Sequence, residues 1–184
     1  MFSFFSTLKV KRFLFAGLVL VLLTGFLIGC KTEVEDEKLT EGTWPGNLVG
    51  KFASSINPQW GGDYFNITKS GETVTIKYGS LSTTGAETES WAGTVVFVSN
   101  FDSNAGAIIV QYTSGAPETN KPFHVIYYVE LTSTTVSLNN TWQDNGGGNY
   151  NADTVSLDEA RTKFIQDNMG NYMDFDYKTT YTKQ

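Results

Sequence analysis

Short runs in which apolar and polar residues alternate fill the chain beyond its amino-terminal part, and this pattern limits the fold more than any other feature. Phe65 and Ile67 alternate with polar residues, a Ser70-Gly71 turn follows, and the alternation then continues to Tyr78. Successive side chains of a β-strand point to opposite faces, so a period of two predicts strands with one buried face. Because the two runs are separated by a tight turn, they predict an antiparallel hairpin.

Two further strand pairs are predicted in the same way. Residues 91–101 pair with 106–112, and residues 122–131 pair with 134–142. Alternate residues of the stretch 122–131 share a face. One face carries Phe123, Val125, Tyr127, Val129 and Leu131, and the other carries His124, Ile126, Tyr128 and Glu130.

The stretch 156–170 departs from this pattern and predicts a helix. Ser156 and Glu159 have the spacing of a capping box, in which each residue caps the first turn through its side chain. Leu157 and Phe164 fall on one face of such a helix, and a glycine at the end of the stretch is placed to terminate it.

About seven or eight strands, this helix and a final strand around Met173, Phe175 and Tyr177 predict an all-β fold. The regular turn spacing favours an antiparallel meander that closes into a small β-barrel or curled sheet, with one short α-helix before the last strand. A two-sheet sandwich is the alternative. Residues 42–184 are therefore predicted to form a single β domain.

The first 29 residues have a different composition. Lys9, Lys11 and Arg12 precede an uncharged apolar run, residues 13–29, which is the pattern of an export signal. The residues that end this run, Leu27-Ile28-Gly29-Cys30, resemble the lipobox of bacterial lipoproteins. An uncleaved membrane anchor is the alternative, although the run is at the short limit of what spans a bilayer.

The resemblance to lipoproteins implies that a signal peptide, residues 1–29, is cleaved after Gly29. It also implies that the Cys30 thiol receives diacylglycerol and that the new amino group takes a further acyl chain such as palmitate. Residues 30–41 would then form the lipidated cysteine and an acidic tether. In sorting systems that retain lipoproteins with Asp after the cysteine at the inner membrane, Lys31 favours the outer membrane of the cell envelope.

Cysteine usage and charge exclude several alternatives. Cys30 is the only cysteine, so no intrachain disulfide is available and the fold depends on its own core. Removing residues 1–29 removes three positive charges and no negative one, which changes the formal net charge from −6 to about −9. An acidic chain repels phosphate backbones, so no nucleic-acid partner is expected. Membrane lipid is expected to be contacted through acylated Cys30.

Gly42-Thr43-Trp44 opens the β region, and a Gly-x-Trp at the start of the first strand resembles the lipocalin motif. The order of strands, helix and last strand is also similar to that of lipocalins, although the Thr-Asp-x-x-Tyr motif of that family has no equivalent here. The resemblance implies that Trp44 closes one end of a barrel with a ligand-binding interior. Lipocalins place an arginine beside this tryptophan, and Arg161 is the candidate partner.

No catalytic signature or cofactor fingerprint is present, so the chain is predicted to be neither an enzyme nor a cofactor protein. His124 has no evident partner in the sequence and is expected to be structural.

Two loops rich in Asp and Asn, residues 102–106 and 143–153, could bind calcium, but turn chemistry explains their composition equally well. Asp174 and Asp176 could act as a carboxylate pair, and a solvated face is the simpler interpretation.

Two functions are left open. The first is a small apolar or amphipathic ligand held in the barrel, with Ile108, Val110, Val125 and Tyr127 lining the pocket. The second is a surface interaction module, either an adhesin or an envelope-assembly component, that binds an envelope protein or glycan. Trp60 lies between turn residues in "NPQWGGDY" and is a candidate for stacking on sugars or peptides, although core or rim packing is the commoner role.

Overall fold

A computed structural model describes residues 38–140, 152–169 and 179–184. The chain divides into two units, Met1–Asp36 and Glu37–Gln184, and all described residues belong to the second. Its strands are β1 (Gly50–Ala53), β2 (Gly62–Ser70), β3 (Thr73–Leu81), β4 (Glu87–Asn100), β5 (Gly106–Ser114), β6 (Phe123–Val129), β7 (Thr135–Asn140), β8 (Asp153–Thr154) and β9 (Thr179–Lys183). The helices described are α2 (Leu157–Lys163) and the 3-10 helix η1 (Gln166–Asn168).

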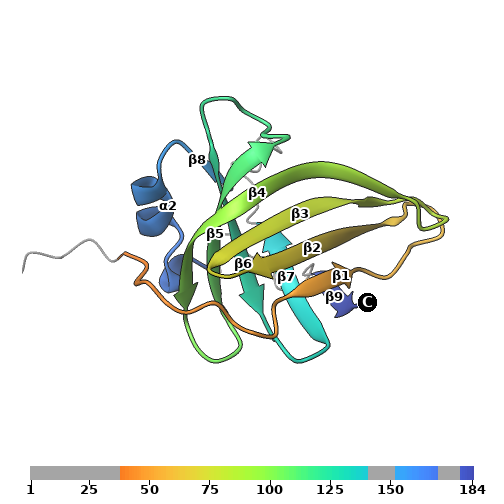
Figure 1. The fold of residues 1–184 in the computed structure, drawn as a ribbon, viewed down its shortest axis with the longest axis horizontal. Helices are drawn as coiled ribbons and strands as arrows, with labels where there is room; N and C mark the ends of the chain where they lie inside the picture. The colour runs from red at the N-terminus through yellow and green to blue at the C-terminus, as the bar shows by residue number, and fades with distance from the viewer. Residues whose placement is uncertain (1–37, 141–151, 170–178) are drawn as a thin grey trace, which may run out of the picture. The chain divides into compact units, whose positions relative to one another are not determined.

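The strands form an antiparallel, closed β-barrel, as the alternation predicts (Figure 1). Eight of the described strands follow one another around it in the order β5-β4-β3-β2-β1-β9-β7-β6, and β6 pairs with β5 to complete the ring. The last strand, β9, closes the barrel because it pairs with both β1 and β7. Closure leaves these strands without free edges, and the alternative of a two-sheet sandwich is wrong.

The three predicted hairpins are all present. They are β2–β3, β4–β5 and β6–β7, with Phe65 opposite Tyr78 in the first of them. Register shifts between Tyr78 and Gly79 and between Val95 and Phe97 interrupt the pairing of β4 with its neighbours. Such bulges bend and twist a strand, and β4 arches across the whole barrel in Figure 1.

The predicted helix is present but shorter than expected. Ser156 caps it as predicted, with its Oγ accepting a hydrogen bond from the Glu159 N–H at 3.1 Å. The Glu159 carboxylate in turn accepts from the Val155 N–H at 3.0 Å. The helix stops at Lys163, because Phe164 leaves helical geometry and is completely buried in the core beneath. The expected last strand around Met173, Phe175 and Tyr177 lies outside the described residues.

Candidate functional site

Among the described residues, buried side chains form one packed cluster inside the barrel. Ile108 and Val110 lie in it as expected, and their exposed fractions are 1% and 0%. Side chains with so little accessible surface adjoin no space large enough for a water molecule. The buried residues of this interior cluster are Leu48, Phe52, Phe65, Ile67, Val74, Ile76, Trp91, Ile108, Val110, Ile126, Tyr128, Leu131, Val136, Leu138 and Tyr181.

Aromatic rings form a continuous chain of contacts through this interior. The Phe65 ring lies 5.2 Å from Tyr181 and 4.9 Å from Tyr78, measured between centroids. Tyr78 contacts Trp91 at 5.7 Å, and Trp91 contacts His124 at 5.1 Å. These are the separations at which tilted and edge-to-face pairs are favourable. The space that a ligand would occupy beside Ile108 and Val110 is therefore taken by the protein itself.

The expectation that Val125 and Tyr127 line the same pocket as Ile108 and Val110 is wrong. Both are completely buried, but they lie in a second cluster on the outer side of β5 and β6, under α2. Ala160 and Phe164 pack there, and the Tyr127 hydroxyl donates to the Ile165 carbonyl at 3.2 Å. Strand β6 is thus buried on both faces, because the helix covers the side that would otherwise face solvent.

Trp44 is half-buried against the interior cluster. It belongs to the segment that leads into β1, and this segment is fastened to the end of β4 by two hydrogen bonds. The Gly42 N–H donates to the Val98 carbonyl at 2.8 Å, and the Thr43 N–H donates to the Asn100 Oδ1 at 2.7 Å. The expected contact of Arg161 with Trp44 is wrong, since the guanidinium lies 4.6 Å from the Phe97 ring centroid and donates to the Leu39 carbonyl.

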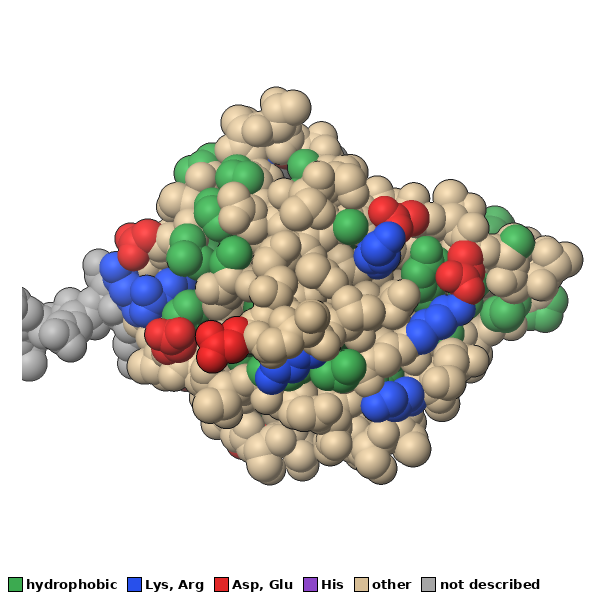
Figure 2. Space-filling model, viewed as in Figure 1, with side chains coloured by type: hydrophobic (Ala, Val, Ile, Leu, Met, Phe, Trp, Pro, Cys, Tyr) green, Lys and Arg blue, Asp and Glu red, His purple; other side chains and the backbone are tan. Residues whose placement is uncertain are grey.

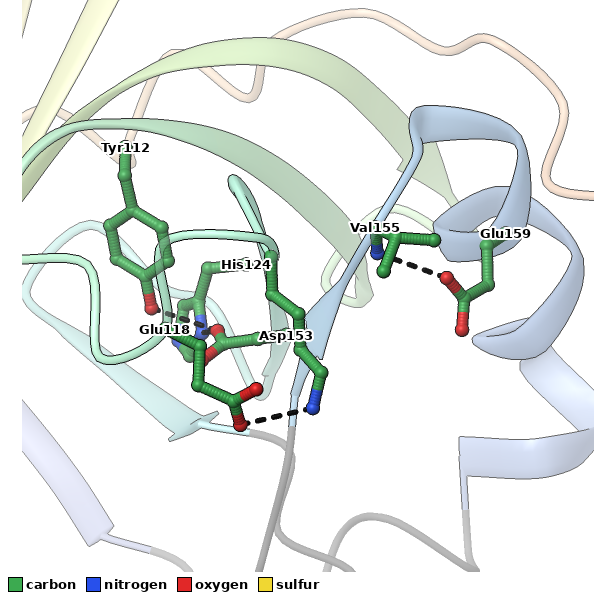
Figure 3. Close-up of polar contacts among 7 residues, drawn as sticks. Tyr112, Glu118, His124, Asp153, Val155 and Glu159 are labelled. Carbon is green, nitrogen blue, oxygen red and sulfur yellow. Dashed lines mark hydrogen bonds and ion pairs between the residues drawn. The ribbon is translucent and has the colours of Figure 1, made fainter.

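A buried polar cluster joins β5, β6 and β8 (Figure 3). The Asp153 Oδ1 accepts a hydrogen bond from the Tyr112 hydroxyl at 2.8 Å and contacts the His124 Nδ1 at 2.7 Å. His124 therefore has a partner that the sequence did not reveal, 29 residues away in the chain. Burial, followed by the charge of Asp153 and its hydrogen bond, raises the pKa of Tyr112 well above its usual range, so this phenol stays protonated and donates.

This cluster accounts for how β8 is held on the barrel. A buried carboxylate is costly unless hydrogen bonds satisfy it, and Tyr112 and His124 supply them to Asp153. Strand β8 is only two residues long and pairs with β6 at His124 itself. The polar contacts therefore fasten a strand that has little backbone pairing of its own.

Neither calcium loop gains support as a metal site. In the loop 102–106, the Asp102 carboxylate caps the turn by accepting from the Asn104 N–H at 2.6 Å. Across residues 38–140, 152–169 and 179–184, no group of three or more His, Cys, Asp or Glu could hold a metal ion. The loop 143–153 is described only from residue 152 onward, and Asp174 and Asp176 lie outside the described residues.

Trp60 is the most exposed large apolar side chain in the described part of the chain. Its exposed fraction is 77%, and that of Ile56 in the same loop is 44%. We call residues 54–61, between β1 and β2, together with 82–86, between β3 and β4, the tip. Figure 2 shows hydrophobic side chains gathered at the right-hand end of the molecule, where Figure 1 places these two loops.

Hydrogen bonds fix the loop that carries Trp60. The Asn57 N–H donates to the Gly61 carbonyl at 2.7 Å, and the Gly61 N–H donates to the Asn57 carbonyl at 2.8 Å. The Asn57 Oδ1 accepts from the N–H groups of Gln59 and Trp60 at 2.8 Å and 3.2 Å. Gly61 has a φ of +79°, and any Cβ there would overlap the carbonyl oxygen of Leu81 at the end of β3. The Trp60 loop therefore contacts β3 closely at a position that requires glycine.

Charge is absent from the tip and concentrated behind it. Residues 54–61 and 82–86 contain no Asp, Glu, Lys or Arg. Immediately behind, Lys51 of β1 pairs with Glu87 of β4, and Lys77 of β3 pairs with Glu89 of β4. Figure 2 shows such oppositely charged pairs between the hydrophobic end and the rest of the molecule. The tip is therefore a neutral surface, in which hydroxyl and amide groups surround the exposed side chains of Trp60 and Ile56.

An indole of this size is a large amount of apolar surface to leave in water. A tryptophan side chain buries roughly 150–250 Å² when it is covered, at about 25 cal/mol per Å². Because 77% of this side chain is exposed, covering Trp60 against a partner would contribute about 3–5 kcal/mol. Because its loop is already fixed, little ordering entropy would oppose that contact.

Comparisons of the chain with protein families, with curated proteins and with solved structures found no match. None of the described helices is long and apolar enough to cross a membrane.

Proposed function

We propose that this protein is a lipid-anchored component of the bacterial cell envelope and that its barrel is an interaction module rather than a ligand carrier. The lipobox-like residues Leu27 to Cys30 support the anchor, with cleavage after Gly29 and acylation of Cys30. Two or three acyl chains would hold the protein firmly, where one chain would bind only marginally.

The observation that carries the interaction-module proposal is the exposure of Trp60 on a fixed loop. A ligand carrier would need space in the barrel, whereas Ile108 and Val110 are packed among side chains. A module that binds another molecule needs a preorganised surface patch, and Trp60 with Ile56 supplies one. Tryptophan is also among the side chains most enriched at the energetic centres of interfaces.

The position of the tip supports the same proposal. The described chain begins, in orange, at the end of this unit opposite the tip (Figure 1). Seven residues separate Lys38 from Cys30, so the tether enters the domain far from Trp60. A tether attached at that end would leave Trp60 free to contact other envelope components. Lys31 favours the outer membrane as the site of anchoring.

The anchor is tested by metabolic labelling with a clickable fatty acid. We expect the wild-type chain to carry the label and to lose residues 1–29. The Cys30→Ala variant should carry no label and should keep its leader, because no other thiol is available. A labelled Cys30→Ala variant, or an unlabelled wild-type chain, would refute lipid attachment at this residue.

The interaction surface is tested by a photo-reactive amino acid placed at Gln59, next to Trp60, in the full chain expressed in its host. Irradiation of intact envelopes should produce a covalent adduct. The matched control is the same amino acid at Val155, which is 56% exposed and lies between β8 and α2. Adducts of equal yield at the two positions, or none at Gln59, would count against the tip as the contact surface.

A further inference from the structure

We infer that the tip binds a neutral polysaccharide of the envelope, with Trp60 stacking on the apolar face of a sugar ring. This inference rests on the proposed function, because it names the partner of the same surface. It depends on three properties of the tip: a single exposed indole, a fixed loop and the absence of charge.

The chemistry of the tip matches that of an uncharged sugar. A pyranose ring has an apolar face of C–H groups and a rim of hydroxyls that both donate and accept hydrogen bonds. Trp60 offers a flat aromatic face, and Gln59 and Thr83 are exposed side chains that can bond to hydroxyls. An exposed aromatic ring with a few polar groups around it provides both orientation and apolar contact.

A membrane is the first alternative occupant, and the charges argue against it. Segments that bind bilayer surfaces combine tryptophan with Lys or Arg, which are attracted to anionic lipid. The tip has a tryptophan but no Lys or Arg, and the mature chain would be acidic. Lys51 and Lys77, which lie behind the tip on β1 and β3, are paired with Glu87 and Glu89.

A charged protein or an anionic glycan is the second alternative. Either would be selected by complementary charges around the contact, which guide association and exclude wrong partners. The tip provides no such charges in residues 54–61 and 82–86. The acidic body would in addition repel an anionic polymer. A neutral partner can approach this uncharged surface without being repelled by the acidic protein around it.

The fixed loop presents one stacking surface in each chain, and a polysaccharide offers many repeated sugars to such surfaces. The Asn57 side chain and the Asn57–Gly61 pairing hold Trp60 outward before any partner arrives. A single stacked sugar gives a weak contact, but many lipid-anchored copies on one membrane would bind one polymer together. Such multivalency raises the overall avidity well above the affinity of one site.

The inference is tested with the host's own envelope polysaccharide. This material is deproteinised, separated by anion exchange into neutral and anionic fractions, and immobilised. The lipid-anchored chain in phosphatidylcholine nanodiscs is then passed over each fraction. We expect saturable retention on the neutral fraction, a loss of about tenfold or more in affinity for Trp60→Ala, and a smaller loss for Trp60→Phe, which keeps an aromatic face. Val155→Ala, at an exposed apolar position away from the tip, should bind like the wild type.

Retention on the anionic fraction only, or equal retention of Trp60→Ala and wild type, would overturn the inference. Because Trp60 is exposed, Trp60→Ala should fold normally, which its melting temperature verifies. If neither fraction retains the chain while the photo-reactive amino acid at Gln59 captures a discrete protein, the polysaccharide inference fails and the interaction module stands. If Gln59 gives no adduct and neither fraction binds, both fail.

Discussion

The Asn57 side chain fixes the position of Trp60: its Oδ1 accepts a hydrogen bond from the Trp60 N–H at 3.2 Å, three residues further along the chain. The same oxygen accepts from Gln59, so one amide group closes the turn that holds the indole outward. Asparagine and aspartate commonly make such turns, because their short side chains reach the backbone two or three residues on.

Asn57→Ala should therefore weaken partner binding although Trp60 remains present. We expect a loss of about 1 kcal/mol or less in the free energy of unfolding, because the lost hydrogen bonds are exposed. Amide hydrogen exchange of Gln59 and Trp60 should accelerate. Asn57→Asp is the matched control for the exchange measurement, since its carboxylate can accept the same two hydrogen bonds. Unchanged exchange in Asn57→Ala would show that the loop is held by other contacts.

Substitutions at two glycines distinguish the cost of backbone strain from the cost of a steric overlap. Gly61 and Gly71 both have positive φ, but a Cβ at Gly71 meets nothing within 4 Å, whereas one at Gly61 overlaps the Leu81 carbonyl oxygen. Gly71→Ala should therefore reduce the free energy of unfolding by about 1–2 kcal/mol, the cost of the left-handed conformation alone. Gly61→Ala should cost clearly more and should disturb Trp60. Chemical denaturation measures both, and equal losses would contradict the close contact between Gly61 and Leu81.

Substitutions at two neighbouring residues of β5 test the interior cluster and the outer cluster separately. Ile108 lies in the barrel interior and Ile109 in the outer cluster under α2, and both are buried. Ile108→Ala and Ile109→Ala should each reduce the free energy of unfolding by about 2–5 kcal/mol. Val96→Ala, at a partly exposed position of β4, should change it by about 0.5 kcal/mol or less. A small loss for Ile109→Ala would mean that the helix does not cover this face.

The buried tyrosines predict a loss of stability in alkali. Burial is the first cause that raises the pKa values of Tyr78, Tyr112 and Tyr181 above the ordinary value near 10. The folded protein therefore keeps these protons at a pH where the unfolded chain loses them. Their contribution to stability is complete below about pH 10 and decreases as the pH rises above that value.

This dependence is measured by chemical denaturation across alkaline pH, together with the near-ultraviolet absorbance of tyrosinate. We expect the tyrosinate signal of these residues to appear with unfolding rather than before it. Their titration near pH 10 in a still-folded protein would show that solvent reaches the rings.

The strand pairs were predictable because alternation and turn residues are local signals. The Ser70-Gly71 turn and the alternation around it predicted β2 and β3, and Ser156 predicted where α2 begins. The end of α2 was not predictable in the same way. Phe164 fits a helical stripe in the sequence, but its burial in the outer cluster turns the chain out of the helix.

The candidate site was predictable only in part. Trp60 was identifiable between turn residues, but its exposure depends on the contact of its loop with Leu81, which no local pattern reveals. The contact between His124 and Asp153 depends on the pairing of β6 with β8 and is equally non-local. The mostly apolar run of β6 was itself a signal that both of its faces are buried, and alternation alone led to the wrong assignment of Val125 and Tyr127.

The most direct test of the account is hydroxyl-radical footprinting of Trp60 in intact envelopes and in the purified lipid-anchored chain. Mass spectrometry gives the oxidation rate of the peptide that contains Trp60, and the peptide that contains Val155 serves as the internal reference. We expect fast oxidation of Trp60 in the purified chain and clear protection in the envelope, with Val155 unchanged. Equal rates of Trp60 oxidation in both preparations would show that nothing covers the tip, which would contradict its role as the contact surface.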